Sequence, residues 1–143
     1  MFNIPVKQVM ERRKVAKLRP NATAAQAAKM MARRGIGAVM IMEDVRLAGI
    51  LTERDLVFRV LARGLDPQTT PVSEVMTEAP RTIGPHEPFG RALAIMHQGR
   101  FRHLPVTDGE TILGVVSARA AMDLDLEEFV SEAQRREYFT AAC

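Results

Sequence analysis

The 143-residue sequence contains no tryptophan, one tyrosine and six phenylalanines. Its core must therefore be built mainly from aliphatic side chains, with nine methionines as adaptable filling. The one cysteine is Cys143, so no disulfide can form within the chain and a reducing compartment is expected. The longest apolar run, residues 36–42, is far too short to cross a membrane. The first residues show no signal-peptide pattern, and we expect a cytoplasmic protein that does not bind membranes.

Basic residues are spread along the chain in small groups. The formal net charge is only +3, and the groups fall at residues 12–14, 33–34 and 100–102. Nucleic-acid binders typically show a basic stripe with aromatics or a known motif. The sequence therefore does not favour a nucleic-acid partner, and the groups indicate solvated faces or an anion pocket.

The residue patterns that mark enzymes and metal sites are missing. The sequence has no Gly-rich phosphate loop and no nucleophile–base motif. Its three histidines, His86, His97 and His103, lie in the second half and form no known ligand pattern. We therefore expect no catalytic activity, no metal site and no resident cofactor.

The clearest positive feature is an internal repeat. The stretch PVKQVM at residues 5–10 matches PVSEVM at residues 71–76, an offset of 66. From Pro20 and Pro85 onward the offset is 65, and it continues without a gap. One shift of register over about fifty aligned positions is hard to obtain by chance. The chain is therefore interpreted as two copies of one unit.

Each copy predicts the same order of elements, β-α-β-β-α. A VxxVM turn and a short extended piece precede a helix whose apolar residues recur at helical spacing, at residues 24–31 and 89–96. Asn21 or Thr23 can cap the first helix, and TDGE at residues 107–110 is typical of a hairpin. One such half cannot bury its sheet face alone. We therefore expect an α/β fold of the α+β type, in which two halves pack about a pseudo-twofold axis.

The chain divides in sequence into residues 1–70, residues 71–125 and a helical extension at residues 126–143. The extension has an apolar face formed by Leu126, Phe129, Val130 and Ala133. It either continues the last helix or forms a separate one. Its apolar face either caps the core or packs against a second copy of the chain.

The turn GILTERDL, residues 49–56, carries the most specific chemistry. A helix that begins near Thr52 leaves free backbone N–H groups that suit a phosphate. Asp55 follows on nearly the same helical face, where its carboxylate can accept hydrogen bonds from two ribose hydroxyls. The same residues are also ordinary helix-capping chemistry. The matching turn of the second copy, GVVSARAA, has Ala120 in place of Asp55.

These features together resemble a pair of CBS domains, the cystathionine-β-synthase-type or Bateman module. The resemblance covers about residues 5–125 and is carried by the VxxVM starts, GILTERD, RHLPVTD, and PRTIGPHEP with Thr82 at its polar position. It implies a regulatory module that binds AMP, ADP or ATP, and it leaves S-adenosylmethionine and NAD open as ligands. It also implies a homodimer. We expect the pair either to act on a separate, unidentified effector protein or to serve as a nucleotide buffer or sensor by changing its own dimer.

The family places the Ser/Thr-x-x-Asp turn of one half opposite the other half, so the resemblance implies a main site shared by both copies. Its residues would be Thr52, Arg54, Asp55, Thr82, Ile83, Arg102, His103 and Leu104. Ile83 and Leu104 would sandwich a base, and backbone groups would read its edge. Arg54, Arg102 or His103 would approach phosphate, although a structural role for His103 is equally open.

A second site would lack the ribose carboxylate because Ala120 replaces it. Its residues would be Lys17, Gly37, Ala38, Val39 and Ser117. Losing a charge-assisted hydrogen bond removes about 1.5–3 kcal/mol, or roughly ten- to a hundredfold in affinity. We therefore expect one competent nucleotide site per chain, around Thr52 and Asp55. The alternative is a protein-interaction or dimerisation module with no physiological nucleotide ligand.

Overall fold

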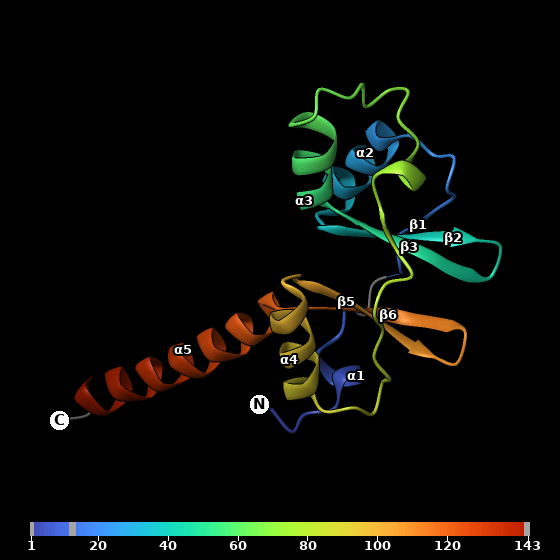
Figure 1. Ribbon diagram of the computed structural model, residues 1–143. Helices are drawn as coiled ribbons and strands as arrows, with labels where there is room; N and C mark the ends of the chain where they lie inside the picture. Colours follow the sequence, from blue (N-terminus) through green and yellow to red (C-terminus); the bar gives the residue numbers. More distant parts are fainter. Residues whose placement is uncertain (1, 12–13, 142–143) are drawn as a thin grey trace.

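The computed structural model describes residues 2–11 and 14–141, and Figure 1 shows two halves, one above the other. The first half contains β1 (Lys17–Leu18), α2 (Ala24–Arg34), β2 (Ala38–Glu43), β3 (Arg46–Thr52), α3 (Glu53–Asp55) and the π-helical segment η1 (Leu56–Leu61). The second half contains α4 (Phe89–Gly99), β5 (His103–Asp108), β6 (Thr111–Ser117) and α5 (Arg119–Ala141). Three short elements complete the chain, namely α1 (Val6–Val9), η2 (Val72–Glu74) and β4 (Thr77–Glu78). The predicted α/β fold with two repeats and a C-terminal helix is confirmed.

Each half is built on a β-hairpin, and the two hairpins share one register. The first sheet has the order β1-β2-β3-β4, and the second consists of β5 and β6. The β2–β3 hairpin has a bulge after Ile41, and the β5–β6 hairpin has one after Val106, 65 residues later. Leu18 pairs in parallel with Ile41, whereas the second half keeps only a single parallel bridge from Ile83 to Val106. The offset seen in the sequence therefore also holds for backbone pairing.

The two halves exchange their VxxVM segments. Val6 is fully buried in the core of the second half, and its N–H donates to the carbonyl oxygen of Glu87 at 2.8 Å. Val72 is fully buried in the core of the first half, and its N–H donates to the carbonyl oxygen of Ala22 at 2.7 Å. Each core thus takes residues from both sides of the predicted division after residue 70.

A methionine from each VxxVM segment covers the glycine in the middle of a β3 or β6 strand. Met76 lies over Gly49, and Met10 lies over Gly114. A Cβ atom on Gly49 would collide with the Met76 side chain and lie 2.9 Å from the carbonyl oxygen of Thr77. The glycine of both GIL and GVV therefore allows the exchanged segment to approach the strand.

The local signals in the sequence place helix starts and turns correctly. Thr23 is the N-cap of α2 and forms a capping box with Gln26, which confirms one of the two predicted caps. Gly35 ends α2 in the left-handed region with φ +62°, as Arg100 ends α4 with φ +55°. Gly109 has φ +60° in the turn between β5 and β6, so the predicted TDGE hairpin is confirmed.

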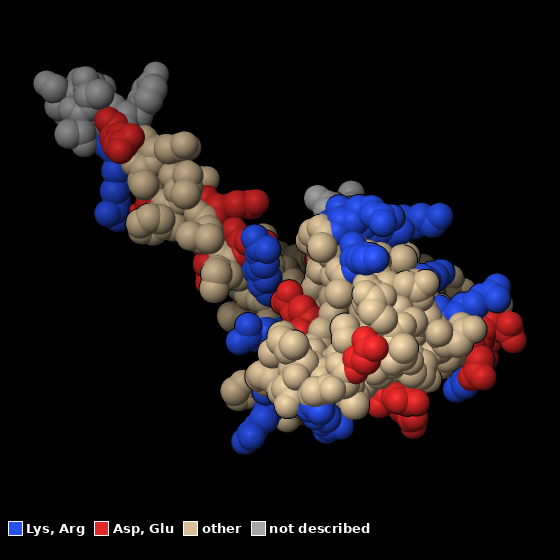
Figure 2. Space-filling view, turned by 90° about the horizontal axis from the view of Figure 1, so that it is seen from above, with Lys and Arg blue, Asp and Glu red and all other residues tan. Residues whose placement is uncertain are grey.

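The C-terminal extension continues the last helix and leaves the body of the protein (Figures 1 and 2). Within α5, Leu124 packs against the second core. Beyond it, Leu126, Phe129 and Val130 are 52%, 69% and 48% exposed. The expectation that this segment caps the core is therefore wrong, because the helix axis carries its apolar face away from the body. Across the described residues, no helix combines the length and the apolar character needed to span a bilayer.

Candidate functional site

The Thr52–Asp55 turn forms a closed helix cap. The N–H of Thr52 donates to Asp55 Oδ2 at 2.9 Å, and the Thr52 hydroxyl donates to the same oxygen at 3.1 Å. The N–H of Asp55 donates back to Thr52 Oγ1 at 3.3 Å. Asp55 is only 9% exposed. The capping chemistry that the sequence allowed is therefore formed here, and Asp55 already has protein partners.

Arg59 is a partner of Asp55 that the sequence reasoning missed. Its Nε lies 3.6 Å from Asp55 Oδ1. Its Nη1 donates to the carbonyl oxygens of Val75 and Met76 at 3.3 and 3.1 Å. The Asp-x-x-x-Arg spacing was the available signal, because side chains four residues apart meet on a helix. Arg59 thereby joins the cap to the segment between the two copies.

The other residues of the predicted main site have different surroundings. Ile83 and Leu104 belong to the core of the second half, so their side chains pack within the protein in this structure. Thr82 and Arg102 are exposed. The guanidinium of Arg54 lies over the ring of Phe58, 4.7 Å from its centroid.

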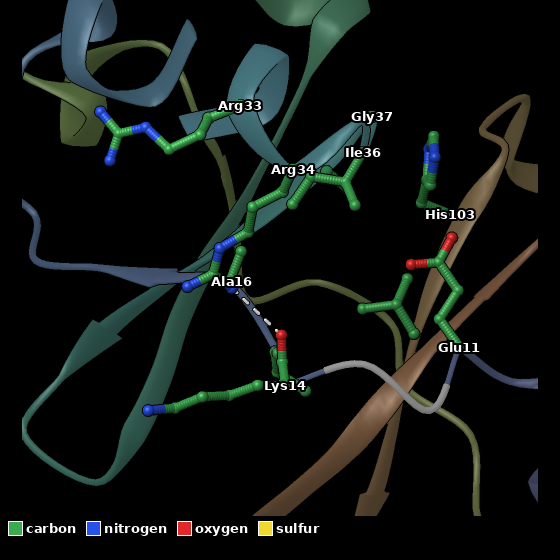
Figure 3. A pocket seen from close by; sticks show the side chains of 11 residues that line it. Glu11, Lys14, Ala16, Arg33, Arg34, Ile36, Gly37 and His103 are labelled. Carbon is green, nitrogen blue, oxygen red and sulfur yellow. Dashed lines mark hydrogen bonds between the residues drawn. The ribbon is translucent and has the colours of Figure 1, made fainter. Parts of the chain in front are cut away.

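A cavity of about 370 Å³ opens where the leading segment of the first copy meets the second copy (Figure 3). It is lined by Glu11, Lys14, Val15, Ala16, Arg33, Arg34, Ile36, Gly37, Ala38, His103 and Val115. His103 comes from the predicted main site, whereas Gly37 and Ala38 come from the second one. Neither Thr52 nor Asp55 lines this cavity. The structure therefore brings together parts of both predicted sites.

Small residues line the first-copy side of this cavity. At the offset of 65, Gly37 and Ala38 of the first copy correspond to the larger Arg102 and His103 of the second. A Cβ atom on Gly37 would lie 3.1 Å from both Glu53 Oε1 and His103 Nε2. Glycine here keeps room between β2 and the side chain of His103.

The cavity has a cationic side and a side that carries His103. Lys14, Arg33 and Arg34 extend along one side, and Glu11 lies near His103 on the other (Figure 3). Arg34 Nη1 donates to the carbonyl oxygen of Lys14 at 3.1 Å, which ties the leading segment to the end of α2.

Burial is the main influence on the protonation of His103. It lowers the pKa of His103 below the ordinary value of 6.5. Glu53 and Glu11 raise this pKa, and Arg102 lowers it, but burial outweighs the two carboxylates. The imidazole is therefore neutral at pH 7, and among the described residues that line the cavity the positive charge comes from Lys14, Arg33 and Arg34.

A family model described as CBS domain matches the chain twice, at residues 6–62 and 72–127. The chain belongs to the CBS-domain family. Each match begins at the VxxVM segment and runs through one hairpin into the helix that follows it. The predicted resemblance to a CBS pair is therefore confirmed.

Known CBS proteins share both the sequence and the fold of this pair. Over 98 residues it is 45% identical to the CBS domain-containing protein CBSCBSPB1 of Arabidopsis thaliana. That match covers 68% of this chain but 18% of the relative, so the chain spans less than a fifth of that protein. A solved CBS-domain protein from Burkholderia ambifaria MC40-6 is 30% identical with a TM-score of 0.81, covering 87% of this chain and 95% of that one.

A third comparison shows the same fold with ligands bound. The CBS domain pair of protein MJ0100 was solved in complex with 5′-methylthioadenosine and S-adenosyl-L-methionine. It has a TM-score of 0.78 at 22% identity, covering 87% of this chain and 98% of that one. At this level of identity the likeness shows the fold alone.

The remaining residues of the second predicted site in this CBS pair are dispersed. Lys17 lines a separate, wider cavity of about 820 Å³, bounded by the two hairpin turns at residues 43–45 and 110–112. Val39 is fully buried in the first core. Ser117 is half-buried and pairs with His103 across the second hairpin. Within residues 2–11 and 14–141, no group of three or more His, Cys, Asp or Glu side chains is placed to hold a metal ion.

Proposed function

We propose that this CBS pair is a non-catalytic regulatory module that binds an adenosine-containing ligand in the cavity between its two copies. The observation that carries the proposal is the shared wall of the cavity, in which Gly37 and Ala38 of the first copy face His103 of the second. A ligand held there contacts both copies. Its binding therefore favours one arrangement of the two halves, as a regulatory module requires.

The dimensions and lining of the cavity suit a nucleoside. Its volume of about 370 Å³ lies within the range of about 300–1,000 Å³ found for small-molecule sites. Val15, Ile36 and Val115 provide apolar contacts for a base. The family resemblance supports AMP, ADP or ATP as the ligand, and the complex of protein MJ0100 adds S-adenosylmethionine and 5′-methylthioadenosine. The effector would be a separate protein in the cytoplasm.

The Thr52–Asp55 turn is the second location at which we propose that a nucleotide can bind. A ribose there would have to displace the Thr52 donors and Arg59 from the carboxylate of Asp55. The two locations are separable by mutation. Gly37→Leu would fill the cavity without touching Asp55, and Asp55→Ala would remove the carboxylate without changing the cavity lining.

A ligand panel tests this proposal. AMP, ADP, ATP, S-adenosylmethionine, 5′-methylthioadenosine and NAD would be added separately during thermal unfolding. At about a hundredfold over its Kd, a true ligand stabilises the fold by about 2.7 kcal/mol, which raises Tm by several degrees. Loss of this shift in Gly37→Leu, with retention in Asp55→Ala, assigns binding to the cavity. If no compound moves Tm, the ligand proposal fails.

A dimerisation module is the second candidate, with a second copy of this chain as the partner. Val57 and Leu61 of η1 are 49% and 76% exposed, and Met122 and Leu126 of α5 are 64% and 52% exposed. These two pairs are related by the offset of 65. In Figure 1, α3 with η1 continuing from it and the start of α5 lie on the same side of the two halves. Equivalent patches on one side suit a self-complementary twofold interface.

Sedimentation equilibrium tests the second candidate directly. A dimer is expected over the micromolar range, and it should weaken when Leu61 is changed to Ser. A monomer at all concentrations would exclude the homodimer.

A further inference from the structure

The cationic side of the cavity is assembled from two separate segments. Arg33 and Arg34 stand in the last turn of α2, and Lys14 belongs to the segment that leads into β1. The hydrogen bond from Arg34 Nη1 to the carbonyl oxygen of Lys14 holds the two segments together. Three cationic side chains thus line one side of a single cavity (Figure 3).

The opposite side of the cavity carries a carboxylate and an imidazole. Glu11 is the one acidic residue among the described residues that line the cavity, and it lies near His103, away from Arg33 (Figure 3). Because burial lowers the pKa of His103, its ring adds no positive charge at neutral pH. Val15, Ile36 and Val115 are the larger apolar residues of the lining. Among the described lining residues, the cationic side chains Lys14, Arg33 and Arg34 therefore lie together, apart from Glu11 and His103.

We infer that this cavity selects polyphosphorylated adenosine, ATP and ADP, over AMP and S-adenosylmethionine, and that Lys14 and Arg33 form the polyphosphate subsite. The inference rests on the proposed function and adds the ligand class. The base would lie against the apolar lining, and the phosphates would point to the end of α2. Each added phosphate brings negative charge to the cationic side. S-adenosylmethionine carries its own positive charges and gains nothing there.

The test compares ligands that differ only in their phosphates. Adenosine, AMP, ADP and ATP are titrated calorimetrically into the full chain without Mg²⁺, at low and at physiological salt. We expect ATP to bind at least about tenfold more tightly than AMP, because a charge-assisted hydrogen bond is worth about that factor or more. Added salt should weaken ATP binding more than adenosine binding, because it screens exposed charges.

Two variants and a matched control assign the effect to the subsite. Arg33→Gln and Lys14→Gln should each lower ATP affinity by about tenfold and leave adenosine affinity within about twofold. Lys29→Gln removes the same charge from an exposed position of α2 that does not line the cavity, and it should leave ATP affinity within about twofold.

The possible failures are distinguishable. Equal affinities for ATP and AMP, or equal losses of ATP and adenosine binding in Arg33→Gln, would overturn the polyphosphate subsite while leaving adenosine binding intact. A loss in Lys29→Gln as large as that in Arg33→Gln would mean a general charge effect and would also overturn it. Absence of binding by all four compounds would overturn this inference, whereas the proposed function fails only if S-adenosylmethionine, 5′-methylthioadenosine and NAD also do not bind.

Discussion

Arg59 Nε lies 3.6 Å from Asp55 Oδ1, and the equivalent residues of the second copy are Leu124 and Ala120. Both of these apolar residues pack against the second core. A buried carboxylate needs hydrogen bonds or a cation, and Arg59, whose side chain is 40% exposed, supplies a cation to Asp55. The equivalent positions are therefore occupied by an ion pair in the first copy and by two apolar residues in the second. Ala120 lacks the carboxylate of Asp55, and Leu124 lacks the guanidinium of Arg59.

A double-mutant cycle tests whether Asp55 and Arg59 act as a unit. Asp55→Ala removes the cap and leaves the guanidinium without its carboxylate, so we expect a loss of about 1–3 kcal/mol in the free energy of unfolding. Arg59→Leu should cost about 1–2 kcal/mol. The double variant reproduces the Ala120–Leu124 pair and should lose clearly less than the sum of the two. Urea unfolding gives the free energy of unfolding of the two single variants and the double variant.

An exposed pair at the same spacing provides the control. Arg91 Nη1 lies 3.1 Å from Glu87 Oε2 on the surface. Arg91→Leu should change the free energy of unfolding by less than about 1 kcal/mol, because exposed ion pairs contribute little. Strict additivity of Asp55→Ala and Arg59→Leu would contradict the coupled pair.

The repeat and its local elements were predictable because their signals are short-range. At the offset of 65, the two hairpins have equivalent strand pairing, and their bulges after Ile41 and Val106 also correspond. The cap at Thr23 and the turn at Gly109 follow from the preferences of single residues. The spacing of Thr52 and Asp55 is compatible with both helix capping and ligand binding, and the structure forms the capping arrangement.

The exchange of Val6 and Val72 between the two cores could not be read from the sequence. Both VxxVM segments are alike, so either can pack on its own half or on the other with the same side chains. Each copy also has the glycine that allows the close approach, Gly49 or Gly114, so this feature is the same in both arrangements. The direction of α5 is a similar case, since an apolar stripe predicts burial but does not identify the surface that buries it.

The cavity does not follow from the turn motif. That motif emphasises Asp55, which is present in one copy and absent from the other, but neither Thr52 nor Asp55 lines the cavity. The residues that do line it include Gly37 and Ala38, which correspond to the larger Arg102 and His103. The sequence shows residues 33–34 as a basic group that suits an anion pocket, but it does not show that folding brings Lys14 beside them.

Substitution of the strand glycines tests the exchange of segments. Gly49→Ala would place a Cβ atom against Met76 and 2.9 Å from the carbonyl oxygen of Thr77, so we expect a loss of about 1–3 kcal/mol. Gly114→Ala should cost less, because its nearest atoms are 3.0 and 3.1 Å away. In Gly84→Ala the new Cβ atom would lie 3.6 Å from its nearest neighbour, which is ordinary contact, so this variant is the control. Urea midpoints that do not follow this order would contradict the close packing.

The protonation of His103 predicts a pH dependence of stability. Because burial lowers the pKa of the folded state below 6.5, the unfolded chain binds the proton more readily. The contribution of neutral His103 to the free energy of unfolding is therefore fully present above the pKa of the unfolded state. It is lost as pH falls from there through the lower pKa of the folded state. We expect the urea midpoint to drop between about pH 7.5 and about pH 5.5, and His103→Gln to reduce this drop.

The neighbouring charges and an exposed histidine define the controls for this titration. Glu53, Glu11 and Arg102 are the charged groups that affect the pKa of His103. His97 is exposed, so His97→Gln should leave the pH dependence unchanged. An NMR titration that places the pKa of His103 at or above 6.5 would contradict the prediction.

The apolar face of α5 predicts an effect of mutation on assembly that is separate from folding. Leu126 and Phe129 are exposed in the single chain, so changing both to Ser should alter the free energy of unfolding of the body by less than about 0.5 kcal/mol. If the face pairs with a second copy, the same change should shift the sedimentation equilibrium towards monomer, because apolar area leaves the interface. Glu128→Ser alters an exposed residue away from that face and should leave the mass unchanged. Equal masses for the wild type and the double variant would show that α5 does not hold the dimer, and the patch at Val57 and Leu61 would then have to account for any association.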